Sequence, residues 1–265
     1  MTLTVGIDIG TTSVKAVVAG DDGTIVGRVR LPHRLVIPSP NRMEHDAREA
    51  WWQGPRRAWL ALASPEVEAV AVAAMVPALT AVGDHGRPVG AGLLYGDERG
   101  QEPDTAGAGG EGASGDPAAN GETLAFLRWL AAAHPDAAGY WHPQAVANRA
   151  LGGDAAVDFG SAFASGPLLC SSGWDGEACR ERGAAPHQLP AIRMFGEAIG
   201  EVAVGPTRGA IIGGGGVDAF CEQIVAGVDE VGDVLVVCGS TLVVWAVAEG
   251  WPACPGLWTV PYHLP

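Results

Sequence analysis

The chain has 265 residues, a formal net charge of −14, 48% hydrophobic residues and 17% charged residues. This composition is typical of a globular protein and excludes a disordered tail, while the length allows one large domain or one domain with the beginning of a second. Because nucleic acids and anionic membranes are bound chiefly through Lys and Arg, the acidic balance argues against both as main partners.

No export or membrane signal is apparent in the sequence. The first strand-like run has no basic segment, signal-type apolar core or small-residue cleavage site before it, so we expect the protein in the cytoplasm. The most apolar stretch, residues 69–82, is too short to span a membrane and contains Pro77, which favours a buried pair of strands. The five cysteines lack a CxxC pair and a histidine at zinc spacing, and we interpret them as reduced thiols.

Three strand-like runs open the chain. Residues 4–9, 14–19 and 24–31 are rich in apolar and β-branched side chains, and Asp21-Asp22-Gly23 predicts a turn between the second and the third. We therefore expect three antiparallel strands at the N-terminus.

A helix and two further strands are expected next. Apolar and aromatic residues recur at helical spacing between residues 47 and 62, and Asp46 precedes them as a candidate N-cap. Residues 67–75 and 79–83 are predicted to be buried strands, followed by a turn over residues 84–88. Three strands, a helix and a strand in this order predict a mixed α/β architecture.

The pattern is weaker in the second half of the chain. Residues 101–121 are rich in Gly, Ala, Asp and Pro and are predicted to form a mobile loop, and residues 140–190 are interpreted as irregular. Residues 124–133 are predicted to form a helix with Phe126, Leu127 and Leu130 inward. The remaining predicted elements are strands over residues 202–204, 209–212 and 234–238 and a helix over residues 219–225 that ends at Gly227.

The first candidate site is the turn between the first two predicted strands, Asp8-Ile9-Gly10-Thr11-Thr12-Ser13-Val14-Lys15. Gly10 lets backbone amides approach phosphate oxygens, the Thr and Ser hydroxyls are donors, and a carboxylate at Asp8 can hold Mg²⁺ through water. Lys15, the only lysine of the chain, adds a cation. The alternative is an ordinary Gly-Thr hairpin in which Asp8 hydrogen-bonds to the turn.

Two further segments have the same character. Four glycines, residues 213–216, precede Asp218 between a predicted strand and a predicted helix, and a carboxylate there could accept the proton of an attacking hydroxyl group. The alternative is a plain glycine loop with Asp218 as a helix N-cap. Gly239-Ser240-Thr241 follows the next strand and is either a second phosphate loop or a simple turn.

Taken together, these segments resemble a known family. Residues 5–16, Val-Gly-Ile-Asp-Ile-Gly-Thr-Thr-Ser-Val-Lys-Ala, closely resemble the first phosphate motif of the actin, Hsp70 and sugar-kinase superfamily in the form found in FGGY carbohydrate kinases. Further similarities follow in family order: Met43-Glu44-His45-Asp46 with Trp51-Trp52, the strand pair and turn over residues 77–88, Tyr95-Gly96-Asp97-Glu98-Arg99 as a Trp-x-Asp-x-Arg segment, and Asp218 followed by Gly227, Gly232-Asp233 and Gly239-Ser240-Thr241.

The resemblance implies a ribonuclease H-like (actin-like ATPase) α/β fold, with Asp8 and Asp218 converging on one cleft. It implies ATP and Mg²⁺ as cofactors, Asp218 as the general base, and Asp8 as a metal ligand through water. The residues implied to face the ATP phosphates are Gly10, Thr11, Thr12, Ser13, Lys15, Gly239, Ser240 and Thr241. Those implied to lie near the sugar are Pro77, Asp97, Arg99 and Asp218, although Asp97 and Arg99 could instead form an ion pair that fixes their loop. Glu44 and Asp46 are interpreted as helix-capping residues and His45, His85, Trp51 and Trp52 as structural.

The sequence also departs from the family pattern. Met75-Val76-Pro77 stands where many members have Gln-Met-His, which leaves the sugar open, and members are considerably longer. We expect a sugar-binding N-terminal domain ending between residues 205 and 250, with residues 251–265 as the start of a second domain. The expected function is an ATP-dependent carbohydrate kinase acting on a sugar or polyol, with a separate C-terminal half or a second copy as a possible partner. The alternatives are a non-catalytic sugar-binding or regulatory module and an Hsp70-like ATPase.

Overall fold

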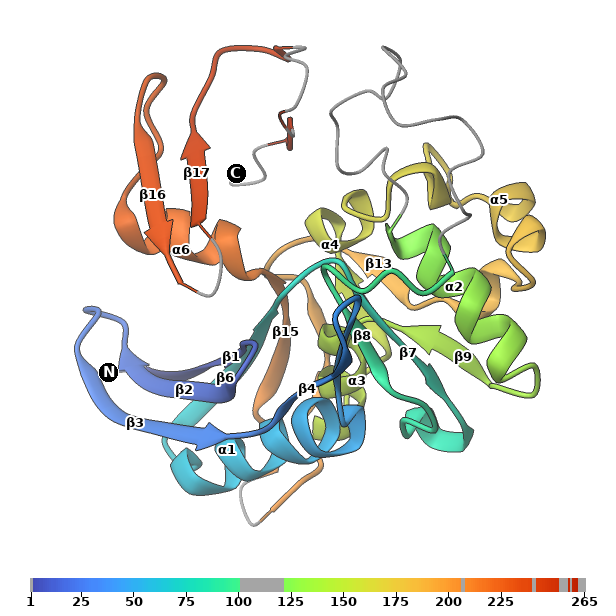
Figure 1. The fold of residues 1–265 in the computed structure, drawn as a ribbon. Coiled ribbons are helices and arrows are strands. Elements are labelled where there is room, and N and C mark those ends of the chain that lie inside the picture. Colours follow the sequence, from blue (N-terminus) through green and yellow to red (C-terminus); the bar gives the residue numbers. More distant parts are fainter. Residues whose placement is uncertain are drawn as a thin grey trace.

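A six-stranded mixed sheet forms the centre of the molecule (Figure 1). The computed structural model describes residues 2–100, 122–205, 208–239, 242–252, 257 and 259–261. In the strand order β14-β15-β6-β1-β2-β3, the strands β15, β6 and β1 run parallel to one another and the remaining pairs are antiparallel. The strands are β1 (Leu3–Ile9), β2 (Ser13–Gly20), β3 (Ile25–Pro32), β6 (Val67–Ala74), β14 (Ala198–Glu201) and β15 (Ile211–Val217). The predicted N-terminal strands and the mixed α/β architecture are confirmed.

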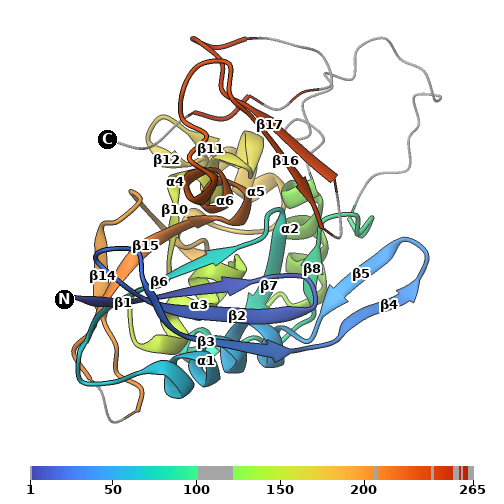
Figure 2. The ribbon, with the colours of Figure 1, turned by 90° about the vertical axis from the view of Figure 1, so that its left-hand side faces the viewer.

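The alternation of apolar residues in β1 and β2 gives the sheet one buried face. Val5, Ile7 and Ile9 are buried in the main core, whereas Asp8 and its cross-strand partner Lys15 lie on the other face. Helix α1 (Gly54–Leu62) covers the buried face beneath β1–β3, as Figure 2 shows. The opposite face is therefore free to carry polar side chains.

The helix predicted over residues 47–62 is present but starts as a π-helical turn (Arg48–Gln53) that continues into α1. Asp46 Oδ1 accepts hydrogen bonds from the backbone N–H groups of Arg48 (2.9 Å) and Glu49 (3.1 Å), which confirms its predicted capping role. Trp51 and Trp59 are completely buried in the core on this helical segment.

A second, antiparallel sheet has the strand order β4-β5-β8-β7-β9. Its strands are β4 (Leu35–Ser39), β5 (Arg42–His45), β7 (Ala78–Val82), β8 (Gly92–Leu94) and β9 (Gly139–Trp141). The predicted strands 67–75 and 79–83 both exist, but they belong to different sheets, β6 to the first and β7 to the second, and do not pair with each other. Helix α2 (Glu122–Ala133) packs on β7 with Phe126, Leu127 and Leu130 fully buried, as predicted.

Residues 140–190 are not irregular, which corrects the sequence interpretation. They contain β9, α3 (Pro143–Leu151), β10 (Ala156–Asp158), α4 (Phe159–Phe163), β11 (Leu169–Cys170), β12 (Gly173–Trp174) and α5 (Gly176–Glu181), and β10 pairs with β13 (Ala191–Arg193). Helix α3 is buried on nearly every side, polar Gln144 and Asn148 included. The sequence pattern missed this helix because its polar residues do not mark it as part of the core, although Gln144 bonds to the Val72 carbonyl oxygen and Asn148 to that of Ala156. Short 3₁₀ turns span Asp84–Gly86, Gly166–Leu168 and Pro186–Gln188.

The glycine run before Asp218 forms a strand rather than a loop. Residues 213–216 lie within β15, beside β6, with an irregular register between Gly213 and Gly216. A Cβ built on Gly215 would lie only 1.8 Å from the carbonyl oxygen of Val72, so this position accepts only glycine. The predicted strand over residues 202–204 is also wrong. The strand that pairs with β15 is β14, which ends at Glu201.

The last described elements are a helix that follows β15 directly and a hairpin outside the central sheet. Helix α6 (Asp218–Ala226) ends at Gly227, which has the left-handed φ of 67° expected of a C-terminal cap. The strands β16 (Val234–Cys238) and β17 (Leu242–Ala246) form a separate hairpin, seen beside α6 in Figure 1. The predicted mobile loop over residues 101–121 lies outside the described residues. The four cysteines in the described part are free, and no helix there is long and apolar enough to cross a membrane.

Candidate active site

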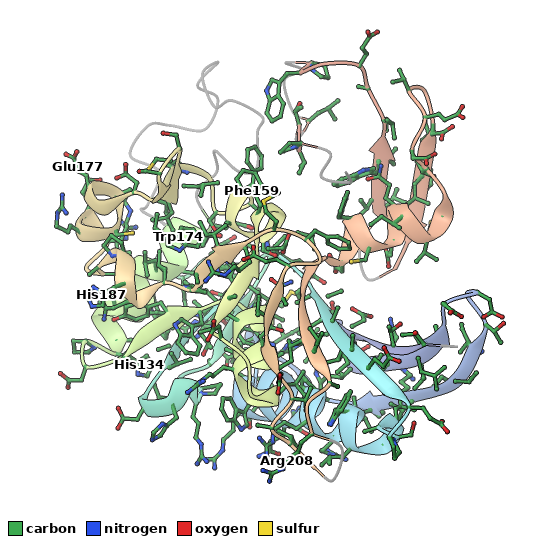
Figure 3. The ribbon with its side chains drawn as sticks, turned by 180° about the vertical axis from the view of Figure 1, so that it is seen from behind. His134, Phe159, Trp174, Glu177, His187 and Arg208 are labelled. Atoms are coloured by element: carbon green, nitrogen blue, oxygen red, sulfur yellow. The ribbon has the colours of Figure 1, made fainter. Side chains whose placement is uncertain are left out.

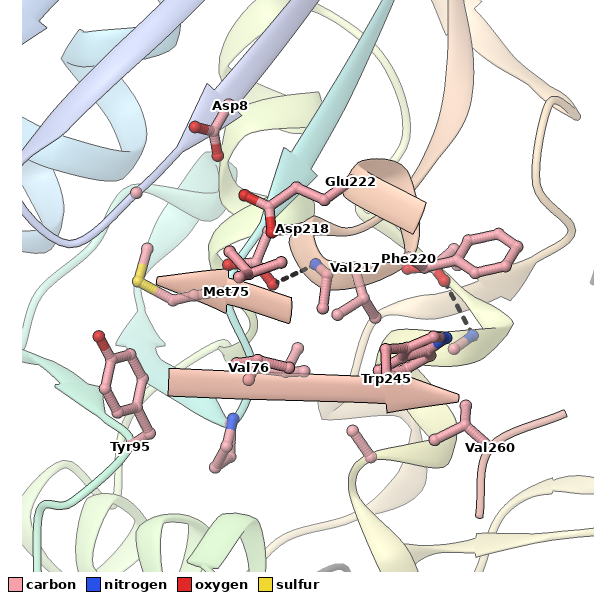
Figure 4. A pocket seen from close by; sticks show the side chains of 18 of the residues that line it. Asp8, Met75, Val76, Tyr95, Val217, Asp218, Phe220, Glu222, Trp245 and Val260 are labelled. Carbon is pink, nitrogen blue, oxygen red and sulfur yellow. Dashed lines mark hydrogen bonds between the residues drawn. The ribbon is translucent and has the colours of Figure 1, made fainter. Parts of the chain in front are cut away.

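A cavity of about 570 Å³ opens where the β1–β2 turn, the start of α6, helix α4 and the β16–β17 hairpin meet. Figure 4 shows the carboxylates of Asp8, Asp218 and Glu222 around this space. Asp8 and Asp218 are far apart in sequence, and their expected convergence on one cavity is confirmed. The other sequence-predicted site residues that line it are Gly10, Thr11, Thr12, Ser13, Lys15, Pro77 and Gly239. Ser240 and Thr241 lie outside the described residues.

The β1–β2 turn (residues 10–13) is a tight hairpin turn and a wall of the cavity at the same time, so the two interpretations of this segment do not exclude each other. It is closed by a hydrogen bond from Gly10 N to the Ser13 carbonyl oxygen (3.1 Å). Lys15 Nζ lies 3.2 Å from Asp8 Oδ2, with 58% of the lysine side chain exposed. Such an exposed ion pair adds little stability, and both charges remain accessible to a ligand in the cavity.

Two histidines support the turn from the side away from the cavity. His45 Nδ1 accepts from Trp51 Nε1 (3.0 Å), and its Nε2–H therefore donates to the Thr11 carbonyl oxygen (2.8 Å). The His33 Nε2 atom lies 3.1 Å from the Gly10 carbonyl oxygen. In a trans peptide the C=O and the following N–H point in opposite directions, so the N–H groups of Thr11 and Thr12 point away from the histidines. The structural role assigned to His45 is thus a positioning of the turn backbone.

Two buried histidines should make the stability of the fold depend on pH in the acidic range. Desolvation lowers the pKa of His45 and that of His142 to about 4, and His142 stacks on Trp174 (labelled in Figure 3) with Nε2 next to Ser165 Oγ. An unfolded histidine titrates near pH 6.5, so below that pH the unfolded chain binds more protons than the folded one.

We therefore expect the free energy of unfolding to fall as the pH decreases from about 6.5 towards 4, by up to about 3 kcal/mol for each of these histidines. Urea unfolding at pH 7.5 and pH 5 measures the loss. Replacement His45→Gln should reduce it, whereas His85→Asn, at an exposed position with φ of 61°, should not. Buried carboxyls such as Asp218 contribute with the opposite sign, and comparison with the wild type cancels them. An unchanged pH dependence in the His45 variant would contradict the assignment.

Asp218 is the first residue of α6 and has an unusual environment for a carboxylate. Burial, together with the charges of Asp8 and Glu222, raises its pKa to about 6. Its Oδ1 accepts from the adjacent Ala219 N–H (2.8 Å), and the N-cap position belongs to Val217. The helix-capping alternative is therefore not what the structure shows. A carboxylate with a pKa near neutrality is a better proton acceptor than an ordinary one.

Asp97 and Arg99 form a buried ion pair. Arg99 Nε and Nη2 donate to the two carboxylate oxygens of Asp97 at 2.9 and 2.6 Å, and the backbone N–H groups of Arg99 and Met43 also donate to Asp97. Burial alone would raise the pKa of Asp97, but these hydrogen bonds hold it below its usual value. Arg99 Nη2 also forms an ion pair with Glu44 Oε2 (2.5 Å). Glu44 was expected to cap the helix, but in the structure it belongs to this ion pair instead. Neither Asp97 nor Arg99 is among the described residues that line the cavity, an arrangement that favours the ion-pair interpretation.

Comparison with known proteins identifies the family. The model of the N-terminal domain of the FGGY family of carbohydrate kinases matches residues 3–219. The chain belongs to the FGGY family. A glycerol kinase from Nocardia farcinica is 26% identical over 233 residues, which cover 78% of this chain and 46% of that protein.

Solved structures show the same fold. A xylulose kinase from Rhodospirillum rubrum superimposes with a TM-score of 0.76 at 23% identity, over 88% of this chain and 53% of that one. A Plasmodium falciparum glycerol kinase with ADP gives a TM-score of 0.75 at 17% identity, over 92% of this chain and 54% of that one. The expected actin-like ATPase fold is confirmed, and this FGGY chain spans about half the length of the relatives it matches.

Sequence reasoning missed several residues of the FGGY cavity. The Tyr95 hydroxyl shares a 2.7 Å hydrogen bond with Thr11 Oγ1, which joins the loop after β8 to the β1–β2 turn. Glu122 at the start of α2 also lines the cavity, and burial raises its pKa. Tyr95 lies in the quoted Tyr-Gly-Asp-Glu-Arg segment, whereas nothing in the sequence around Glu122 pointed to the site.

Asp158 also lines the cavity but has a structural role. Its Oδ1 accepts from the N–H groups of Gly160 (2.8 Å) and Ser161 (3.2 Å), and its Oδ2 accepts from Ser161 Oγ (2.5 Å). These bonds occupy both carboxylate oxygens and cap α4. Asp158 is therefore held as a helix cap rather than kept available to a ligand.

Part of the cavity lining is aromatic. Phe195 and Phe220 meet edge to face with ring centroids 5.9 Å apart. Aromatic faces stack on the C–H faces of a bound molecule, while the carboxylates and the β1–β2 turn offer polar contacts. The aromatic residues of this part of the lining are Phe159, Phe163, Phe195, Phe220 and Trp245.

The donor set is compatible with magnesium. Carboxylate oxygens of Asp8 and Asp218 face the same cavity, and Mg²⁺ is bound through one or two carboxylates with several waters and substrate phosphates. Among the described residues, no group of three or more His, Cys, Asp or Glu side chains is arranged as a metal-binding cluster.

Proposed function

We propose that this chain forms the acceptor-binding half of an ATP-dependent carbohydrate kinase, which transfers the γ-phosphoryl group of ATP to a hydroxyl of a sugar or polyol. The observation that carries the proposal is the convergence of Asp218, with its raised pKa, and the β1–β2 turn on one cavity. The FGGY relatives are carbohydrate kinases, which supports the reaction class. We also propose that the protein works in the cytoplasm.

In the proposed reaction Asp218 accepts the proton of the acceptor hydroxyl. The hydroxyl oxygen forms a bond to the γ-phosphorus while the bond to the oxygen bridging the β- and γ-phosphates breaks, so that ADP leaves and the proton stays on the Asp218 carboxyl group. Lys15 and the N–H groups of the β1–β2 turn stabilise negative charge on the phosphates. Bound magnesium ATP supplies the phosphoryl group, and Asp8 would hold the ion through water.

Because relatives are about twice as long, the nucleotide should also need contacts from a second half. We propose that residues up to a boundary between 205 and 250 form the acceptor domain, and that residues 251–265 begin the second. A separate polypeptide, a longer chain or a second copy could complete the site, which would include Gly239, Ser240 and Thr241. Phosphoryl transfer depends on positioning, so a cavity that lacks one wall should be slow.

Calorimetry on the chain tests the proposal. The titrants are glycerol, xylulose, gluconate and further pentuloses, hexuloses and polyols, followed by magnesium ADP. We expect saturable binding of at least one acceptor and measurable binding of magnesium ADP. Nucleotide binding should be weakened in Asp8→Asn and unchanged in Glu66→Gln, which carries the same loss of charge at an exposed site. Acceptor binding without nucleotide affinity, even with a C-terminal half added, would instead support the non-catalytic module. Binding of neither would refute both.

A further inference from the structure

Three charged side chains form a row across the central sheet. Asp8 on β1 pairs in register with Lys15 on β2, and Lys15 pairs with Arg30 on β3. Directly opposed residues of neighbouring antiparallel strands project from the same face of a sheet. All three line the cavity, so the row extends the polar wall from the carboxylate through the ammonium group to a guanidinium group.

Arg30 is tied to the β1–β2 turn. Its Nε donates to Ser13 Oγ at 3.2 Å, and Ser13 is buried with only 2% of its surface exposed. A guanidinium group has five N–H donors, and among the described residues only Ser13 accepts from the Arg30 side chain, so this bond orients the group and leaves its Nη atoms to bind a ligand. The bond places those donors at the end of the turn that faces the cavity.

The charge balance suggests what these donors bind. Among the ion pairs of the described residues, Lys15 is neutralised by Asp8, whereas none involves Arg30. The chain has a net charge of −14, and its cavity already carries the carboxylates of Asp8, Asp218 and Glu222. The positive charge of Arg30 favours an anionic ligand in the cavity. The planar guanidinium group, with its paired N–H donors, is complementary to phosphate oxygens in particular.

We propose that Arg30 is a phosphate ligand of this chain, which binds the terminal phosphates of the nucleotide together with Lys15 and is oriented for this by Ser13. This inference rests on the proposed kinase function and adds a residue that no motif of the sequence identified. Arg30 has two roles in it: its charge offsets that of the polyphosphate, and its fork fixes the position of one phosphate.

Calorimetric titration of the chain with magnesium tripolyphosphate tests the inference without the acceptor or the adenosine. The variant Arg30→Gln should bind at least about tenfold more weakly, since hydrogen bonds to charged groups are the strong ones. The matched control is Arg28→Gln: Arg28 is exposed on the same strand and the same face, loses the same charge, pairs with Val17 and is not among the cavity-lining residues. It should change the affinity by less than about twofold. Arg30→Lys should fall between the wild type and Arg30→Gln.

The outcomes separate the inference from the proposed function. Equal affinities of the Arg30→Gln and Arg28→Gln variants would overturn the role of Arg30 and leave the kinase proposal standing. If the wild-type chain bound no tripolyphosphate, both would be contradicted. Inorganic phosphate is the second titrant, because a response to it equal to that for tripolyphosphate would point to a phosphorylated product rather than a nucleotide. Unchanged circular dichroism and thermal unfolding of the variants confirm that binding, and not folding, was altered.

Discussion

Replacing Asp218 by Asn should reduce phosphoryl transfer by about a hundredfold to ten-thousandfold, measured in a protein that includes the second half of the kinase. The amide has nearly the same shape as the carboxylate but cannot accept the acceptor's proton, so acceptor binding should remain measurable. Because the base must be ionised and burial raises the pKa of Asp218 to about 6, kcat/KM of the wild type should fall as the pH decreases through about 6.

The control for this prediction is Glu222→Gln. Glu222 lies one helical turn after Asp218, lines the same cavity and loses the same charge on substitution. It should lower the rate by less than about tenfold, because it holds no proton in the proposed reaction. Retained turnover in the Asp218 variant, or an equal loss in both, would refute the general-base assignment.

The substitution Asp218→Asn should also stabilise the fold. A carboxyl group whose folded pKa lies above its unfolded value opposes folding once it is ionised, so its cost is present above about pH 6 and disappears at low pH. We expect Asp218→Asn to raise the free energy of unfolding at pH 8 by about 1 to 2 kcal/mol and to leave it nearly unchanged at pH 4. Such a gain in stability with a loss of activity is characteristic of an active-site residue.

Gly215→Ala should destabilise the protein by at least about 4 kcal/mol or prevent folding. A Cβ at this position would meet the Val72 carbonyl oxygen at 1.8 Å, and neither backbone can move away without separating β15 from β6. The effect reaches the site as well, because β15 leads directly into Asp218.

Gly213→Ala, in the same strand, is the matched control for Gly215→Ala. Its Cβ would come no closer than 3.9 Å to the carbonyl oxygen of Val70, which is ordinary contact, so the cost should stay within about 1 kcal/mol. Urea unfolding monitored by tryptophan fluorescence measures both variants. Similar midpoints for the two would show that the close approach at Gly215 does not exist.

Local patterns in the sequence were sufficient for the elements whose signals are short-range. The period of two in β1 and β2, the cap at Asp46 and the left-handed Gly227 all depend on neighbouring residues, and each was predicted. The turn after β1 and the helix that begins at Asp218 were predicted for the same reason. The order of these motifs along the chain then indicated the family.

Tertiary structure decided what depends on contacts between distant segments. The glycines before Asp218 resemble a loop in isolation, and only the pairing with β6 makes them a strand, with the Val72 carbonyl so close to Gly215 that a side chain is excluded. Helix α3 was missed because its polar residues Gln144 and Asn148 are buried by contacts with segments that the local pattern does not include. Arg30 is an unremarkable strand residue until the pairing of three strands sets it beside Lys15 and Ser13. The sequence by itself therefore determined the motifs and the family, whereas packing determined which side chains share the cavity, because burial and cross-strand register are properties of the folded chain alone.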